Sequence, residues 1–171
     1  REKFARLVNA PASAIAAARN VSDGVNSVAW ALPMEEGDNV IVTAEAEHPN
    51  NIYPWLRQQR RGIEVRVVEP NQDGSLNVGR MIEAIDSRTK AMTCATVTFA
   101  PGHRADTRRL GEACRKNDVF FLVDGVQSAG ILRHDLADEP IDGFATSTSK
   151  GLLGLYGFGF LYVSENWVDR M

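Results

Sequence analysis

Lys150 is the residue of this sequence whose surroundings most clearly suggest chemistry. It follows the hydroxyl-rich run TSTS, residues 146–149, and precedes the glycine-rich apolar run GLLGLYGFGFLYV, residues 151–163. Most lysines are exposed, and a plain loop lysine remains one interpretation. The small and apolar flanks favour a partly desolvated amine, which loses affinity for its proton and becomes a usable nucleophile. Such an amine can form a Schiff base with an aldehyde.

Asp124 ends the apolar run VFFLV, residues 119–123, where a carboxylate is costly to bury unless a cation or a donor meets it. One interpretation is structural, because Asp-Gly is a good turn signal and Asp124 could cap the turn DGVQ, residues 124–127. The chemical interpretation is a buried carboxylate that holds a protonated heteroaromatic nitrogen. The residues themselves leave both open.

Three serines and one histidine complete this set of candidates. Ser22 stands where a helix is expected to begin, and Ser147 and Ser149 come just before Lys150. Hydroxyls beside the unpaired N–H groups of a helix start suit a phosphate, and a plain N-cap at Ser22 is compatible with that role. His48 follows a buried strand. Its imidazole could stack on a planar ring, take part in proton transfer or simply be satisfied within its loop.

Seven strands are expected to position these side chains, and most of them alternate with helices. The expected strands cover residues 13–20, 39–46, 63–70, 89–99, 119–125, 142–147 and 157–164. The expected helices cover residues 1–10, 23–32, 77–85, 106–118 and 165–171, and residues 49–61 are expected to be a loop that enters a further helix. Ser22 is the expected N-cap of the second helix, and Gly62 is the expected stop of the helix within residues 49–61.

This alternation predicts an α/β fold, a three-layer α/β/α sandwich on a mostly parallel seven-stranded sheet with helices on both faces. The last strand is expected to be antiparallel, because the link between residues 147 and 157 is too short for a crossover helix. In open α/β sheets, ligands bind at the carboxyl ends of the strands. Ser22, His48, Asp124 and Lys150 all follow such ends, so their convergence on one rim is the main functional signal.

Composition argues against several other classes of function. The 171 residues, 44% of them hydrophobic, suffice for one domain, and a net charge of −3 creates no field that would attract nucleic acid. Cys94 and Cys114 lack paired spacing, which predicts no disulfide and fits a reducing cytoplasm. The three histidines lack the spacing of metal ligands, so no metal site is expected. The sequence holds no apolar run long enough for a membrane span, so no membrane partner is expected.

Four motifs, in this order along the chain, resemble the class V aminotransferase family of pyridoxal-phosphate enzymes. NVSDGVNSVAWAL, residues 20–32, is similar to the family's phosphate-loop segment, and EAEHPNNIYPW, residues 45–55, is similar to its Glu-His segment. VDGVQSAG, residues 123–130, matches its Asp-Gly-x-Gln segment, and STSKGLLGLYGFGFLYV, residues 147–163, matches its lysine segment. The family includes cysteine desulfurases, selenocysteine lyases and epimerases related to isopenicillin N epimerase, and it has the aspartate aminotransferase-like fold.

The resemblance implies a role for each candidate residue. Lys150 would form the internal aldimine with pyridoxal 5′-phosphate and would later move the substrate's α-proton. Asp124 would pair with the protonated pyridine nitrogen, Gln127 would contact the phenolic oxygen of the ring, and His48 would stack on the ring face. The phosphate would be held by Ser22, the backbone of Asp23, Ser147 and Ser149.

Some residues depart from the family pattern. Ser149 stands where relatives commonly have a histidine, and Ser22-Asp23 replaces their Thr-Glu. Phe99 stands near the position where desulfurases often have an asparagine, and neither cysteine stands where a desulfurase has its persulfide cysteine. We therefore expect a transaminase, lyase or epimerase that acts on an amino acid, ahead of a cysteine desulfurase or selenocysteine lyase.

The resemblance covers nearly the whole chain and implies that residues 1–171 form the cofactor-binding large domain of a homodimeric enzyme. The chain starts without a methionine and ends without a helix stop, so we expect a piece that lacks an N-terminal segment and a small C-terminal domain. One alternative is a cofactor-binding domain without catalysis of its own. Another is a nucleotide-binding domain, which would need a glycine-rich loop that RNVSDG, residues 19–24, lacks. His103 and Arg104 follow the strand of residues 89–99 and have no assigned role.

Overall fold

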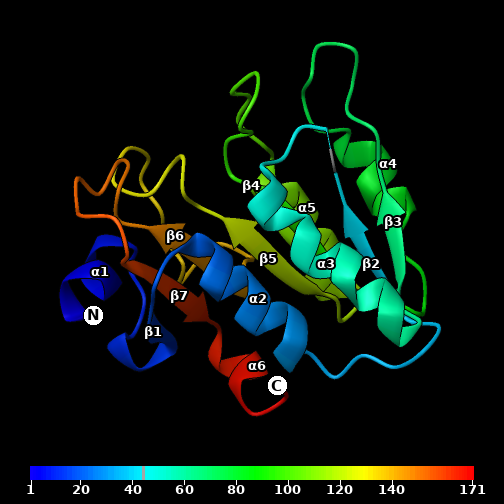
Figure 1. Ribbon diagram of the computed structural model, residues 1–171, viewed down its shortest axis with the longest axis horizontal. Coiled ribbons are helices and arrows are strands. Elements are labelled where there is room, and N and C mark those ends of the chain that lie inside the picture. The colour runs from blue at the N-terminus through cyan, green and yellow to red at the C-terminus, as the bar shows by residue number, and fades with distance from the viewer. Residues whose placement is uncertain (44) are drawn as a thin grey trace.

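The computed structural model describes residues 1–43 and 45–171, and its centre is one seven-stranded sheet (Figure 1). The strands are β1 (Ile15–Ala18), β2 (Asn39–Val42), β3 (Glu64–Val67), β4 (Thr89–Ala95), β5 (Phe120–Asp124), β6 (Gly143–Ser147) and β7 (Gly159–Val163). Their order across the sheet is β1-β7-β6-β5-β4-β2-β3. β7 is antiparallel to both β1 and β6, and the other pairings between these strands are parallel. The predicted mostly parallel sheet with one antiparallel strand is confirmed.

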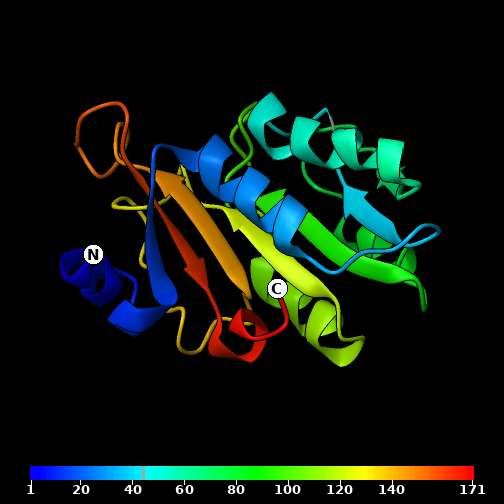
Figure 2. The ribbon, with the colours of Figure 1, turned by 60° about the horizontal axis from the view of Figure 1, so that its bottom comes forward.

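Helices cover both faces of the sheet, as a three-layer sandwich requires. The α-helices are α1 (Glu2–Leu7), α2 (Val21–Ala31), α3 (Tyr53–Gln58), α4 (Val78–Glu83), α5 (Thr107–Lys116) and α6 (Glu165–Val168). Short 3-10 helices are η1 (Ala12–Ala14), η2 (Pro49–Asn51) and η3 (Gln59–Arg61). Figure 2 shows α2 and α3, in blue and cyan, on one side of the sheet and α5, in yellow-green, on the other.

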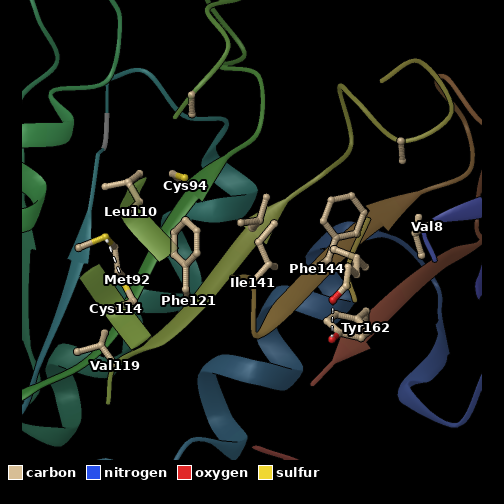
Figure 3. Packing of buried hydrophobic residues seen from close by; sticks show 14 of the residues in the cluster. Val8, Met92, Cys94, Leu110, Cys114, Val119, Phe121, Ile141, Phe144 and Tyr162 are labelled. Carbon is tan, nitrogen blue, oxygen red and sulfur yellow. Dashed lines mark hydrogen bonds between the residues drawn. The ribbon is translucent and has the colours of Figure 1, made fainter. Parts of the chain in front are cut away.

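Two apolar cores result, one on each face. The first joins α1, α4 and α5 to the sheet and includes Phe121 and Phe144 (Figure 3). The second joins α2, α3 and α6 to the opposite face and includes Trp55 and Phe120. Adjacent residues of β5 point to opposite faces, so both must be apolar. This explains the continuous apolar run that the sequence shows before Asp124.

Several elements end earlier than expected. β2 stops at Val42, and residue 44 of the expected strand lies outside the described residues. β4 stops at Ala95, because the chain then leaves the sheet for a loop in which Val97 pairs with Arg104. Residues 49–61, expected to be a loop that enters a helix, form η2, α3 and η3 in succession, and Gly62 ends the helical segment in a left-handed conformation, as predicted.

The N-cap of α2 was predicted at the wrong residue. Asn20 is the cap: its side-chain oxygen accepts a hydrogen bond from the amide of Asp23 at 2.9 Å. Ser22 lies inside the first helical turn instead. Asparagine and serine are equally good N-caps, so the local pattern did not distinguish the two positions.

The ends of several strands meet at one edge of the sheet. Ala95 of β4 pairs with Asp124 of β5, and Asp124 pairs in turn with Ala145 of β6. Gly159, the first residue of β7, lies between Ser147 of β6 and the last residue of β1. A side chain at Gly159 would come within 2.4 Å of a backbone oxygen of β6, so glycine permits this close return of the chain. The edge brings the starts of α2 and of the lysine loop together.

Candidate active site

A cleft of about 250 Å³ opens at this edge of the sheet. Seven of the eight predicted site residues line it: Ser22, His48, Asp124, Gln127, Ser147, Ser149 and Lys150. They come from the α2 start, the segment before η2, the end of β5 and the loop after β6. The eighth, Asp23, does not line the cleft.

Asp124 lies at the floor of the cleft and is only 5% exposed. One of its carboxylate oxygens, Oδ1, accepts a hydrogen bond from the amide of Val126 at 2.9 Å. Oδ2 has no hydrogen-bond donor among the described residues. Burial raises the pKa of Asp124 to about 6, although the Val126 amide and the charge of Lys150 lower it. The side chain therefore both caps its turn and leaves Oδ2 for a donor or a cation, so the two interpretations of Asp124 are compatible.

The first turn of α2 forms one wall of the cleft. The amide of Val21 donates to Ser147 Oγ at 2.8 Å, which joins the helix start to the end of β6. The amide of Asp23 donates to the Asn20 cap, whereas the amide of Ser22 meets no acceptor within the described part of the chain. Ser22 and Ser147 are half-buried beside it. Unpaired N–H groups and hydroxyls at a helix N-terminus are suited to bind an anion such as a phosphate.

Asp23 faces away from this wall. Its carboxylate pairs with Arg19 at 2.8 Å and also accepts a hydrogen bond from the Arg19 amide at 3.1 Å. The pKa of Asp23 is lowered by the hydrogen bond from the Arg19 side chain and by that from the Arg19 amide. The ion pair offsets a negative charge that would otherwise oppose an anion at the start of α2.

Lys150 lies at the rim of the cleft and is exposed, so the partial desolvation predicted from its flanks is wrong for this structure. The apolar residues that follow it do not cover it, because Leu153, Leu155 and Tyr156 are themselves exposed. Its ammonium nitrogen lies 5.9 Å from the centre of the Phe99 ring, within range of a cation–π interaction.

His48 and Phe99 form an aromatic part of the cleft wall. His48 is half-buried, and its ring meets that of Phe99 edge to face, with the centroids 5.0 Å apart. The Nδ1 atom of His48 accepts a hydrogen bond from the Asn50 amide at 3.3 Å, which fixes the ring in its loop. Phe99 is 55% exposed and borders the cleft. A planar ligand that lies against this part of the wall would meet an aromatic face.

Glu47 is a functional candidate that sequence reasoning missed. It lines the cleft, is 6% exposed and accepts hydrogen bonds from the Ala95 amide and from Asn51 Nδ2, the latter at 3.2 Å. Asn51 in turn accepts a hydrogen bond from Thr93 Oγ1 at 2.7 Å. Burial raises the pKa of Glu47 to about 7, and the neighbouring charge of Asp124 contributes in the same direction. Its position directly before His48 was the one indication of a role in the sequence. Its burial depends on β4, which lies more than 40 residues further along the chain.

Other residues around the cleft lie at its margins. Asn20, Asn50, Val97, Val126 and Tyr156 also line it, and none was a predicted site residue. His103 and Arg104 do not line it. His103 Nε2 instead lies 2.9 Å from the backbone oxygen of Asp73, and Arg104 pairs with Val97 through the backbone.

The arrangement combines an anion cradle, a buried carboxylate and a primary amine around one small cleft. Within residues 1–43 and 45–171, no group of three or more histidine, cysteine or acidic side chains is arranged to hold a metal ion. In the same residues, no helix has both the length and the apolar character needed to cross a membrane. The donors present suit an organic ligand that carries a phosphate and a cationic ring nitrogen.

Comparison with known proteins gives one consistent result. The family model of aminotransferase class-V matches residues 1–171. A protein of Methanothermobacter thermautotrophicus named "Probable cysteine desulfurase" is 37% identical over 166 residues, which are 97% of this chain and 41% of that protein. A protein of Pectobacterium atrosepticum named "Cysteine desulfurase" is 31% identical over all of this chain and 43% of its own length.

Solved structures agree in fold. The cysteine desulfurase CsdA from Escherichia coli matches 99% of this chain and 43% of its own, with a TM-score of 0.92 and 29% identity. The cystine C-S lyase C-DES, in complex with its reaction product cysteine persulfide, matches 99% of this chain and 46% of its own, with a TM-score of 0.91 and 26% identity. The chain thus spans about two fifths of the length of the proteins that it matches.

Proposed function

The chain belongs to the aminotransferase class-V family, and from this premise we propose that it binds pyridoxal 5′-phosphate and acts on an amino acid. The observation that carries the proposal is the buried carboxylate of Asp124, whose Oδ2 faces the cleft without a donor among the described residues. A buried anion of this kind needs a cation or a strong donor nearby, and a protonated pyridine nitrogen is both.

The other donors fit the remaining parts of the same molecule. The unpaired amide of Ser22 and the hydroxyls of Ser22, Ser147 and Ser149 suit a phosphate. His48 offers its ring to one face of the pyridine, and Gln127 lies on the Asp124 turn within reach of the cleft. In this proposal Asp23 supports the cradle only through its backbone and through its ion pair with Arg19.

Each of these residues has a physical task in the proposed reaction. Bound pyridoxal phosphate supplies an aldehyde for a primary amine and a ring that withdraws electrons from the substrate's α-carbon. Asp124 holds the proton on the ring nitrogen, and the α2 start holds the phosphate in place. The Nζ atom of Lys150 would hold the aldehyde end of the cofactor and would take and return the substrate's α-proton. The walls formed by His48 and Phe99 orient the ring and limit access by water.

In the whole protein, we propose that residues 1–171 are the large domain of the enzyme. The matched proteins are more than twice as long, so the rest of the site would come from other parts of the chain or from a second subunit of a homodimer. The exposed side chains of Leu153, Leu155 and Tyr156 next to the cleft are consistent with such a covering element.

A covalent trapping experiment tests the assignment of Lys150. The full-length protein is incubated with pyridoxal 5′-phosphate, reduced with borohydride and digested for peptide mass spectrometry. We expect the added mass on the peptide that contains Lys150 and its loss in Lys150→Ala. Lys90, a half-buried lysine that pairs with Asp38 outside the cleft, provides the matched control Lys90→Ala, which should keep the label. Labelling that survives in Lys150→Ala at another single lysine would refute the assignment.

Removal of sulfur from cysteine is the second candidate, because the named relatives include cysteine desulfurases and a cystine C-S lyase. Cys94 and Cys114, the only cysteines of the sequence, are fully buried, and burial raises the pKa of both thiols. Neither side chain can therefore present a thiolate to accept sulfur. A sulfur-transferring cysteine would have to come from outside residues 1–171.

Product analysis separates the two candidates. The full-length protein is supplied with cysteine, cystine and a panel of amino acids paired with keto acids. Sulfide, alanine or a persulfide from the sulfur amino acids would favour the second candidate. A new amino acid that forms only in the presence of a keto acid would identify a transaminase, and loss of chirality at the α-carbon would identify an epimerase.

A further inference from the structure

A hydrogen-bonded network of Ser128, His134 and Glu139 lies directly behind the turn that carries Asp124 and Gln127; Ser128 and His134 are buried, and Glu139 is half-buried. His134 Nε2 lies 2.9 Å from Ser128 Oγ, and His134 Nδ1 lies 3.4 Å from Glu139 Oε2. Ser128 belongs to the turn itself, since its amide and its hydroxyl both donate to the backbone oxygen of Gly125. This hydrogen-bonded network connects the turn to the loop that precedes β6.

The protonation of Glu139 follows from its contact with His134. The pKa of Glu139 is lowered, because the hydrogen bond and charge of His134 and smaller contributions outweigh the upward effect of burial. Glu139 is therefore ionised at neutral pH, and His134 Nδ1 must carry a proton to meet it. The Ser128 hydroxyl has a single proton, so its contacts with the Gly125 oxygen and with His134 Nε2 share that one donor.

Serine, histidine and a carboxylate in this order are also the parts of a nucleophilic triad. Burial argues against that role, because Ser128 is 0% exposed and does not line the cleft, so no substrate can reach its hydroxyl. His134 is 6% exposed. The network of Ser128, His134 and Glu139 is therefore structural. Its effect depends on the segments that Ser128 and Glu139 hold.

The loop that contains His134 and Glu139 is anchored to α1 and α5. The amide of Leu136 donates to the backbone oxygen of Val8, just after α1, and Asn9 donates to Asp135 at 2.7 Å. Arg108 of α5 pairs with Asp138 at 2.6 Å. These contacts hold the loop that contains His134 and Glu139 against α1 and α5.

Phe144 closes the space beneath the turn. The ring of Phe144 lies where a side chain of residue 125 would be, at 1.9 Å from the position of that missing Cβ, so Gly125 is required for this packing. The same ring packs against His134, with the centroids 4.8 Å apart (Figure 3 shows Phe144 in the core). The turn is thus supported from below by an aromatic ring and from behind by a hydrogen-bonded imidazole.

We propose that His134 is a positioning residue that acts through Ser128 to hold the Asp124–Gln127 turn, so that Asp124 and Gln127 face the bound cofactor. The part that concerns the cofactor rests on the proposed function, whereas the support of the turn does not. Substitution at His134 should loosen the turn locally. It should also weaken cofactor binding without removing any group that touches the cofactor.

Hydrogen exchange of the cofactor-free, full-length protein tests the support of the turn. His134→Phe keeps a ring beside Phe144 but removes both hydrogen bonds, and His134→Gln retains an amide that can reach Ser128. We expect the peptide containing Val126, Ser128 and Ala129 to exchange at least about tenfold faster in His134→Phe and within about threefold of the unsubstituted protein in His134→Gln. A β4 peptide around Met92 should not change. Equal exchange in His134→Phe and the unsubstituted protein, or a uniform increase everywhere, would overturn the proposal.

Ser128→Ala keeps the experiment decisive if His134→Phe does not fold. It removes one buried hydroxyl with little loss of volume, and we expect the same local increase in exchange. Unchanged exchange in Ser128→Ala would then overturn the proposal.

Titration with pyridoxal 5′-phosphate tests the positioning role. We expect a dissociation constant at least about fivefold higher in His134→Phe, with recovery in His134→Gln. Faster local exchange with unchanged affinity would overturn the role toward the cofactor. If the unsubstituted protein binds no pyridoxal phosphate, the proposed function fails, and the exchange measurement still decides whether His134 supports the turn.

Discussion

At the scale of single residues, the cleft is dominated by two buried carboxylates. Asp124 accepts one backbone hydrogen bond, and Glu47 accepts one from the Ala95 amide and one from Asn51. Burial is the main reason that their pKa values rise, to about 6 and about 7, respectively. Lys150 is the cation whose charge acts on Asp124, and it lies exposed at the rim. At neutral pH the cofactor-free site therefore carries buried carboxylate charge that Lys150 offsets only in part.

This charge predicts how stability depends on pH without cofactor. A carboxyl group with a higher pKa in the folded than in the unfolded protein binds its proton more tightly when folded. It therefore favours the folded state at low pH, and this advantage is lost as pH rises through the folded pKa. The contribution of Asp124 and Glu47 to the free energy of unfolding should fall as pH rises from about 4 to about 7. Urea unfolding at a series of pH values measures this fall.

Two amide variants serve as controls for this prediction. Asp124→Asn and Glu47→Gln remove the charge and preserve the shape, so each should flatten part of the pH dependence. Asp124→Asn should also weaken binding of pyridoxal phosphate by at least about tenfold, because the ring nitrogen loses its anion. A pH profile that is identical in all three proteins would contradict the assignment.

At the scale of elements, α2 is the one that links fold and site. Its cap, Asn20, satisfies the amide of Asp23, and its first amide is held by Ser147 of β6. The amide of Ser22 then remains for a ligand. Asn20 itself also lines the cleft. The same residue therefore caps α2 and borders the proposed phosphate cradle.

A pair of substitutions at Asn20 separates these two roles. Asn20→Ala removes the cap and should cost about 1 kcal/mol of stability. Asn20→Asp keeps a good cap and should leave stability unchanged, but its negative charge next to the cradle should weaken phosphate and pyridoxal phosphate binding about tenfold or more. Thermal unfolding and ligand titration measure the two effects. Equal affinity in Asn20→Asp and the unsubstituted protein would place the phosphate elsewhere.

At the scale of the whole molecule, the central strand β5 couples the two cores. Phe121 packs into the core under α5, and its neighbour Phe120 packs into the core under α2 and α3. Both side chains are completely buried. Because the same strand supplies both faces, loss of packing on one side disturbs the strand that the other side needs.

We therefore expect one cooperative unfolding transition. Phe120→Leu and Phe121→Leu should each lower the free energy of unfolding by about 1 to 2 kcal/mol. Tryptophan fluorescence reports on the core that contains Trp55, and thiol labelling reports on the other core, which contains Cys94 and Cys114. Each variant should shift both signals by the same amount. Separate midpoints for the two probes would show that the cores unfold independently.

The sequence by itself determined the architecture and most of the residues of the candidate site. Local patterns predict strands and helices, the short link before β7 predicts its direction, and the apolar run before Asp124 predicts a buried carboxylate at the end of a strand. These features depend on neighbours along the chain, so they can be inferred without coordinates. The order of strand ends then brings seven of the eight predicted residues around one cleft.

The tertiary structure decided what depends on partners distant in sequence. Glu47 is held by an amide 48 residues away, and the support behind Asp124 reaches from His134 to α1 and α5, which are far apart in sequence. Whether Lys150 is covered depends on the path of the apolar residues that follow it, and here they leave it exposed. Burial and hydrogen bonding are set by packing in three dimensions, and no local pattern of residue types specifies them.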